Sequence, residues 1–151
     1  KDRFFIIRLS FVQFQFARGH NTISNKRQPH GGIASMNRHE KLNYIEFASR
    51  DLTATKVFFS GYLTEIQDYG PEYSAFNDGV LDGGFYQADM ATSYSASGAL
   101  VVFFSEDLQQ TQLKIEQAGG QMVRSVFNFP GGQRFHFCEP SGNEFAVWSD
   151  K

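Results

Sequence analysis

Ser49-Arg50-Asp51-Leu52 is followed, 56 residues later, by Ser105-Glu106-Asp107-Leu108. In both places an apolar run precedes the stretch and a helical pattern follows it. A repeat of this length is too long for a solenoid unit and too short for a domain. We therefore expect two copies that share one core.

Each copy predicts a strand, a capped helix and several short strands. Residues 43–47 and 99–104 are apolar and rich in aromatic or β-branched side chains, which is typical of strands. Asp51 and Asp107 are placed to accept hydrogen bonds from the first helical turn. The sequence predicts an α+β fold of two tandem βαβββ modules, at about 41–90 and 98–150.

The expected helices span about 52–60 and 108–118. Their predicted buried residues are Ala54, Val57 and Phe58 in the first helix and Leu108, Ile115 and Ala118 in the second. Glycine-containing turns, among them residues 82–84 and 130–132, are expected to separate the strands that follow.

Composition indicates one soluble domain. The chain has 151 residues, of which 41% are hydrophobic, and a net charge of −2, which gives no argument for a nucleic-acid partner. The apolar stretches near the N-terminus are interrupted by Arg8 and Gln13 and are too short to predict a membrane span. The single cysteine, Cys138, excludes an intrachain disulfide and fits a reducing compartment, so we expect a cytoplasmic protein in which Cys138 is a small buried side chain.

Residues 1–35 differ from the repeated modules. They turn polar and glycine- and proline-bearing after Arg18, and Met36 lies just before the first module. We expect residues 1–35 to be a leader or an arm, the alternatives being an added edge strand or a partner-binding arm. Residues 36–151 are expected to form a single domain.

The closing stretch carries a resemblance to a known family. The paired modules, the Asp-Leu helix starts and the hairpin Glu139-Pro140-Ser141-Gly142-Asn143 resemble the glyoxalase/bleomycin resistance/dioxygenase superfamily, also called vicinal oxygen chelate, over residues 41–149. The resemblance implies a cupped mixed sheet around one cleft, helices outside, and a homodimer. It leaves the activity open, because the superfamily includes isomerases, dioxygenases, thiol transferases and proteins that sequester drugs.

The resemblance also implies a metal site whose ligands differ here. It places a histidine seven residues before the helix-capping Asp and a glutamate four residues beyond the Gly of the final hairpin. Those positions hold Tyr44 and Ala146, and the equivalent position in the second module holds Leu100. Leucine and alanine have no donor atom, so we expect no metal and no cofactor. The alternative is a relocated site made of Glu46, His136 and Glu144.

Strand alternation selects candidate site residues. If Ala146 marks the cleft face, neighbours two positions away share that face, while Phe145 and Val147 pack against the helices. By the same alternation, Phe135 and Phe137 belong to the core. The predicted site residues are Tyr44, Glu46, Arg134, His136, Glu144 and Trp148.

Each candidate has a functional and a structural interpretation. His136 is a proton shuttle or a histidine held by a neighbouring carboxylate, and Glu46 is a general base or a paired charge. Arg134 clamps an anionic ligand or pairs with Glu46 or Glu144. Trp148 and Tyr44 stack on a flat ligand or simply pack in the sheet.

Two functional classes follow from these residues. The first is a metal-free protein whose cleft binds a small molecule through Tyr44, Arg134, Glu144 and Trp148. The second is a lyase- or isomerase-type enzyme of the same superfamily with Glu46 or His136 as catalytic general base. Neither class involves nucleic acid or a membrane.

Overall fold

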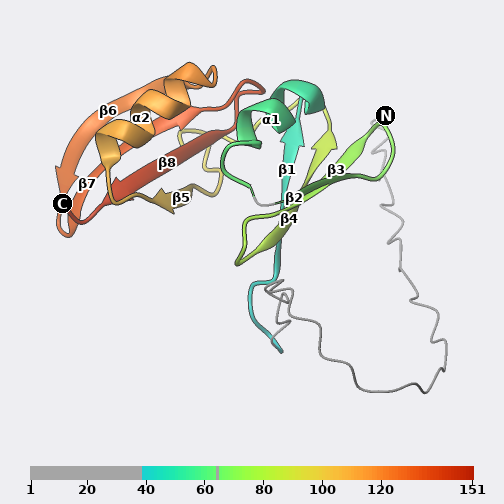
Figure 1. Cartoon of the computed structure of the whole chain (residues 1–151), viewed down its shortest axis with the longest axis horizontal. Coiled ribbons are helices and arrows are strands. Elements are labelled where there is room, and N and C mark those ends of the chain that lie inside the picture. The colour runs from blue at the N-terminus through green and yellow to red at the C-terminus, as the bar shows by residue number, and fades with distance from the viewer. Residues whose placement is uncertain (1–38, 64) are drawn as a thin grey trace, which may run out of the picture. The chain divides into compact units, whose positions relative to one another are not determined.

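A computed structural model gives the structure of residues 39–63 and 65–151. These residues form eight strands and two helices (Figure 1). The predicted leader or arm, residues 1–35, lies outside the described residues. Neither helix of the described part is long and apolar enough to cross a membrane.

The first module is a four-stranded sheet with one helix. Its elements are β1 (Tyr44–Ser49), α1 (Leu52–Phe59), β2 (Glu65–Asp68), β3 (Tyr73–Asn77) and β4 (Asp82–Gln87). The strand order is β1-β4-β3-β2. β1 and β4 are parallel, whereas β4, β3 and β2 pair in antiparallel fashion.

The second module repeats this arrangement. Its elements are β5 (Val101–Phe104), α2 (Leu108–Gln117), β6 (Gln121–Phe129), β7 (Gly132–Cys138) and β8 (Glu144–Ser149). The order is β5-β8-β7-β6, with β5 parallel to β8. The predicted α+β fold of two βαβββ modules is confirmed. The described strands lie in two sheets of four, and a cleft shared by both sheets stays a prediction.

Both helices begin where the sequence predicts. Asp51 Oδ1 accepts a hydrogen bond from the Ala54 N–H at 2.9 Å, and Asp107 Oδ1 accepts one from the Gln110 N–H at 2.9 Å. Such a cap satisfies a helical N–H that has no intrahelical partner and contributes about 0.5–2 kcal/mol. α2 ends before Gly119, whose φ of +95° favours glycine.

The buried helix faces differ in part from the prediction. α1 buries Leu52, Thr55, Phe58 and Phe59. Val57 was predicted on this face but is exposed. It lies two residues from both Thr55 and Phe59, and residues two apart on a helix point to nearly opposite sides. α2 buries Leu108 and Ile115 as predicted, whereas Ala118 is exposed because it caps the helix beyond its last turn.

Gly83 and Gly84 lie inside β4, so the predicted turn at residues 82–84 is wrong. A Cβ on Gly83 would collide with the Phe76 ring, and a Cβ on Gly84 would collide with the Tyr73 hydroxyl. Side chains of β3 thus lie directly across these two positions. The glycines serve close packing within the sheet.

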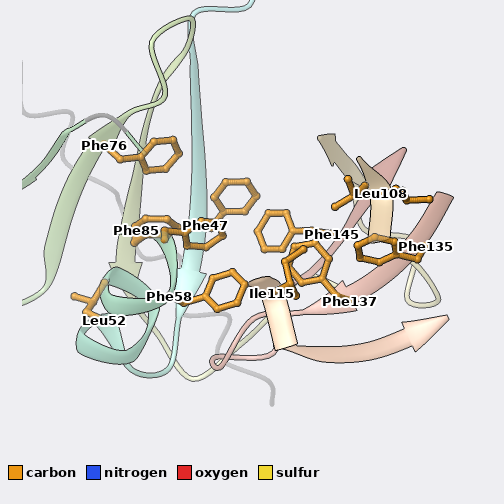
Figure 2. Packing of buried hydrophobic residues seen from close by; sticks show 12 residues of the cluster. Phe47, Leu52, Phe58, Phe76, Phe85, Leu108, Ile115, Phe135, Phe137 and Phe145 are labelled. Atoms are coloured by element: carbon orange, nitrogen blue, oxygen red, sulfur yellow. The ribbon is translucent and has the colours of Figure 1, made fainter. Parts of the chain in front are cut away.

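One cluster of buried side chains, most of them phenylalanines, connects the two modules (Figure 2). The Phe47 ring of β1 lies 5.1 Å from the Phe145 ring of β8, and the Phe58 ring of α1 lies 5.9 Å from the Phe137 ring of β7. Burying one phenylalanine contributes about 1.5–3 kcal/mol. The modules share one core, as the length of the repeat predicts.

The closing hairpin also ties the second module to the first. The buried Glu139 carboxylate accepts hydrogen bonds from the Ser141 N–H at 2.9 Å and from the Thr55 hydroxyl of α1 at 2.9 Å. The Asn143 side-chain amide donates to the Ala48 carbonyl of β1 at 2.7 Å. The stretch that carries the family resemblance therefore has a structural role at the junction of the modules.

Candidate functional site

The six predicted site residues fall into two groups on two sheets. Tyr44 and Glu46 lie on β1, whereas the other four lie on the adjacent strands β7 and β8. In the second sheet, Arg134 is opposite Trp148 and His136 is opposite Ala146. The four residues of the second sheet share one face, as alternation predicts, because the partner positions Phe135, Phe137, Phe145 and Val147 are buried in the core.

His136 and Glu144 form a buried pair. The His136 Nδ1 lies 2.9 Å from the Glu144 Oε1, and both side chains are almost fully buried. The Glu144 Oε2 accepts hydrogen bonds from the Tyr94 N–H at 2.9 Å and from the Ser93 hydroxyl at 3.3 Å. Burial alone would raise the pKa of Glu144, but the hydrogen bonds from His136, Tyr94 and Ser93 outweigh it and lower this pKa. Glu144 is a carboxylate at neutral pH.

The other nitrogen of His136, Nε2, makes no hydrogen bond to any described residue. A carboxylate can only accept, so His136 Nδ1 donates to Glu144 and Nε2 is the ring nitrogen left for another partner. His136 Nε2 is buried and has no hydrogen-bond partner among the described residues. The imidazole lies between the Tyr94 ring, at 5.8 Å, and the Phe127 ring, at 5.9 Å. An unpaired buried polar atom costs about 1–3 kcal/mol, which a bound ligand can recover.

Arg134 does not form the salt bridges considered from the sequence. Glu144 is paired with His136, and Glu46 lies in the first sheet. The Arg134 guanidinium instead lies over the aromatic rings of Phe127, at 5.0 Å, and Phe129, at 5.5 Å. Its Nε is buried without a partner in the described part of the chain.

Further aromatic rings surround Trp148. The indole contacts the Phe104 ring at 5.2 Å and the Phe129 ring at 6.2 Å. A second guanidinium, that of Arg124, lies 3.6 Å from the centre of the Phe127 ring. We call this surface the arginine–aromatic face; it consists of Phe104, Arg124, Phe127, Phe129, Arg134 and Trp148.

In the first sheet, Tyr44 and Glu46 meet through Tyr73. The Tyr73 hydroxyl donates to Glu46 Oε1 at 2.8 Å, so it accepts from the Tyr44 hydroxyl at 2.6 Å. Burial, and then the hydrogen bonds with Tyr44 and Glu46, raise the pKa of Tyr73 far above its ordinary value. Glu46 is exposed and its partner is a tyrosine, so the expectation that Arg134 or His136 pairs with it is wrong.

Several of these contacts were missed from the sequence. Arg124 pairs with His136 and Phe127 pairs with Arg134, so three steps along β6 match two steps along β7. This irregularity breaks strand alternation within β6, a strand that holds none of the six predicted site residues. For Tyr73 a signal existed, because two consecutive glycines in a neighbouring strand indicate that another side chain approaches closely.

The donor atoms do not fit the metal site that the family resemblance implies. Ala146 is completely buried in β8 and offers no donor, and Leu100 offers none either. Within residues 39–63 and 65–151, no three His, Cys, Asp or Glu side chains lie close enough to hold one metal ion. The relocated site of Glu46, His136 and Glu144 is not formed there, because Glu46 belongs to the other sheet.

A cavity of about 330 Å³ lies on the core side of the sheets. Phe58, Phe103, Ile115 and Val147 are among the residues that line it. None of the six predicted site residues lines this cavity. They lie instead on the faces of the sheets opposite the Phe47–Phe145 contact, where strand alternation places them, and His136 and Glu144 are buried there as well.

Two βαβββ modules with the same strand order and a shared core define the class of protein. The chain has the fold of the glyoxalase/bleomycin resistance/dioxygenase proteins. No protein-family model matches the sequence, and no curated protein matches it. The similarity is found by comparison with solved structures.

Three solved structures illustrate this similarity. A glyoxalase-related enzyme from Fulvimarina pelagi is 15% identical, with a TM-score of 0.60 over 74% of this chain and 88% of that one. A glyoxalase/bleomycin resistance protein/dioxygenase family enzyme from Burkholderia phytofirmans PsJN is 15% identical, with a TM-score of 0.58 over 73% and 98%. The fosfomycin resistance protein FosX from Listeria monocytogenes, as a mutant in complex with Mn(II) and dihydroxypropylphosphonic acid, is 18% identical, with a TM-score of 0.61 over 74% and 90%.

Proposed function

We propose that this chain is a glyoxalase/bleomycin-resistance-like protein that binds a small organic molecule on the second sheet without a metal ion. The observation that carries the proposal is the buried, unpartnered His136 Nε2 beside the arginine–aromatic face. A polar atom that is buried without a partner is a preformed position for a ligand atom. Apolar rings around a few fixed polar groups are typical of small-molecule sites.

The surroundings of His136 support a prepared site. Glu144 fixes the orientation and tautomer of the imidazole, and Ser93 and Tyr94 fix Glu144. Ring orientation is therefore determined before any ligand arrives, which reduces the entropy lost on binding. Two separate segments, β8 and the loop at Ser93 and Tyr94, thus hold one buried side chain in a fixed orientation.

The proposal includes no metal because the donor set is unsuitable. The positions that the family resemblance implies as ligands hold Tyr44, Leu100 and Ala146, of which only the tyrosine has a donor atom. Metal analysis of the purified protein, beside thermal unfolding with Mn, Fe, Ni or Zn ions and with EDTA, tests this part. A stoichiometric metal or an ion-specific rise in melting temperature would contradict it.

A homodimer is part of the proposal, because the two candidate groups have complementary chemistry on separate sheets. The first sheet presents Glu46 beside Tyr44, and Asp82 is opposite Tyr44 in the same register. The second sheet presents Arg124 and Arg134. A second copy can bring the first face against the second face and so form one cleft. Sedimentation that gives only monomer across micromolar concentrations would contradict this assembly.

The second candidate function is catalysis by His136 as a general base. A histidine whose Nδ1 is held by a carboxylate and whose Nε2 is free has the geometry of such a base. In this alternative, Nε2 removes a proton from an acidic carbon or hydroxyl of the ligand, and a neighbouring guanidinium stabilises the developing oxyanion. Glu46 is the weaker candidate base, because its carboxylate already accepts a hydrogen bond from Tyr73.

A compound panel tests the proposed function. Cationic, neutral and anionic small molecules are screened by thermal unfolding and by the NMR signal of the Trp148 indole, the single tryptophan of the chain. We expect at least one compound to shift both, and His136→Gln to abolish the shift. The matched control, His39→Gln, changes an exposed histidine and should bind as the native protein does. If no compound shifts the indole signal, the proposed function is wrong.

The same compounds separate binding from catalysis. A bound compound that is recovered unchanged after long incubation supports the binding protein. Turnover that is lost in His136→Gln but kept in His39→Gln and in Glu46→Gln would favour the enzyme with His136 as base.

A further inference from the structure

The charges and rings of the arginine–aromatic face define a class of ligand. We infer that the ligand is a planar aromatic anion, and this inference rests on the proposed function. Its ring packs against Trp148 and Phe129, and its acidic group is held by Arg134 and Arg124. Arg124 and Arg134 supply the positive charge of this face, and Phe129 and Trp148 supply its rings.

Two guanidiniums on this face have no anionic partner among residues 39–63 and 65–151. Within the described residues, the ion pairs of arginine and lysine are Arg50 with Asp89 and Lys56 with Asp68. Arg124 and Arg134 both lie near the Phe127 ring, at 3.6 and 5.0 Å. An aromatic face attracts a cation but leaves its N–H groups without an acceptor. Because both guanidiniums lie near one ring, a single anion can accept hydrogen bonds from both.

Burial makes the missing acceptor more significant at Arg134. Its Nε is shielded from solvent and has no hydrogen-bond partner in the part of the chain that the structure describes. The planar guanidinium matches a carboxylate or another flat oxyanion, to which it donates two parallel hydrogen bonds. His136, on the same strand face two residues along β7, offers a further polar atom at Nε2.

The rings beside Arg134 favour a planar ligand. Trp148 lies edge-to-face with Phe104 and with Phe129, at interplanar angles of 63° in both pairs. Phe104 is half exposed, so a part of this ring cluster is open to a ligand. Flat rings add to such clusters by stacking or edge contacts that contribute about 0.5–1.5 kcal/mol beyond burial.

The face disfavours the other ligand charges. Glu144, the carboxylate that β8 itself contributes to this side of the sheet, is already engaged by His136, Tyr94 and Ser93. A cationic ligand would be repelled by the charges of Arg124 and Arg134. A neutral ring would leave both guanidiniums without an anionic partner, and an anion without a ring would leave the aromatic side chains uncovered.

Three probes separate charge from shape: naphthoate is planar and anionic, naphthamide is planar and neutral, and cyclohexanecarboxylate is anionic but not planar. Each is titrated into the full chain while the NMR signal of the Trp148 indole is followed. We expect naphthoate to shift this signal and to bind about tenfold or more tighter than either comparator, because both charge and stacking are needed. Its affinity should fall as salt is raised.

Matched variants assign the interaction to this face. Arg134→Gln should remove the preference for naphthoate over naphthamide, and Arg134→Lys, which keeps the charge but not the planar fork, should retain part of it. Lys114→Gln removes one exposed positive charge from α2, which packs on the core side, and should leave the preference unchanged. Melting temperatures confirm that each variant is folded.

The outcomes distinguish this inference from the proposed function. Equal binding of naphthoate and naphthamide, or tighter binding of naphthamide, overturns the anionic class and leaves small-molecule binding in place. Naphthoate binding that is unchanged in Arg134→Gln overturns the assignment to this face. If no probe shifts the indole signal, the inference is wrong, and the broader panel of cations and neutral compounds decides the proposed function separately.

Discussion

At the scale of single residues, Glu144 links the candidate site to the stability of the fold. Its carboxylate accepts hydrogen bonds from His136, Tyr94 and Ser93, and its pKa in the folded protein is lowered despite burial. Burial of a charge is tolerated when such partners are present. These hydrogen bonds fix Glu144, which in turn orients His136, and they also contribute to folding.

The lowered pKa of Glu144 predicts a pH dependence. A carboxyl group whose folded pKa lies below its unfolded value of about 4.3 contributes stability that is present above that value. This contribution is lost as the pH falls through the folded pKa. We expect Glu144→Gln to flatten the acid side of the stability curve, measured by urea unfolding from neutral pH downward. Glu106→Gln, which changes an exposed carboxylate, should keep the native curve; an equally flat curve there would contradict the assignment to Glu144.

The hydroxyl of Tyr73 gives a second prediction at this scale. Because it donates to Glu46 and accepts from Tyr44, Tyr73→Phe removes two hydrogen bonds without opening a cavity. We expect a loss of about 0.5–1.5 kcal/mol in the free energy of unfolding, since the group is partly exposed. The control is Tyr86→Phe on β4, whose hydroxyl makes no hydrogen bond among the described residues. A similar loss in both variants would contradict the role of the Tyr44–Tyr73–Glu46 contact.

Alternation along a strand accounts for how much of the site could be predicted from the sequence. It correctly separated Arg134 and His136 from Phe135 and Phe137, because β7 and β8 are regular where they pair. Arg124 was not among the predicted site residues, and the irregular pairing of β6 means that simple alternation would not have placed it on this face. Contacts between separate strands and loops, such as those of Tyr73 and Tyr94, depend on the tertiary structure and have no local period.

At the scale of secondary structure, two glycines show why β4 was partly misassigned. Glycine pairs usually indicate turns, but Gly83 and Gly84 lie within the sheet because Phe76 and Tyr73 occupy the space above them. Local sequence predicts conformational freedom and gives no information about a neighbouring strand. The helix starts at Asp51 and Asp107 were predicted correctly, since capping is a local interaction.

Close packing over Gly84 predicts the effect of adding one methyl group. In Gly84→Ala the new Cβ would collide with the Tyr73 hydroxyl, so Tyr73 must move away from Glu46. We expect a loss of about 1–3 kcal/mol in the free energy of unfolding, the usual range for overpacking. Gly61→Ala is the matched control, because no atom lies within 4 Å of its added Cβ. Equal effects at the two glycines would contradict the proposed packing.

At the scale of the whole molecule, the repeat in the sequence predicted two modules and one core but not which faces meet. The core faces of both sheets meet through Phe47 and Phe145, while the faces that carry Tyr44 and Arg134 lie on the other sides. A repeat gives the same local pattern twice and contains no information about the junction. The hairpin around Glu139 supplies that junction, through contacts to α1 that a single module cannot reveal.

The junction predicts that the modules unfold together. Asn143 donates to the Ala48 carbonyl at 2.7 Å and accepts from the Thr92 N–H at 2.8 Å, so Asn143→Ala leaves two polar groups without partners. We expect a loss of about 2 kcal/mol or more, because each unpaired buried group costs about 1–3 kcal/mol.

Because Phe47 and Phe145 belong to one core, the variant should still unfold in one transition. Trp148 fluorescence reports the second module, and hydrogen exchange of β1 and β4 amides reports the first. In urea both probes should shift together in Asn143→Ala and stay unchanged in Asn128→Ala, which changes an exposed residue of β6. Two separate transitions, or a shift confined to Trp148, would mean that each module is stable by itself. The hairpin would then not couple the unfolding of the two modules.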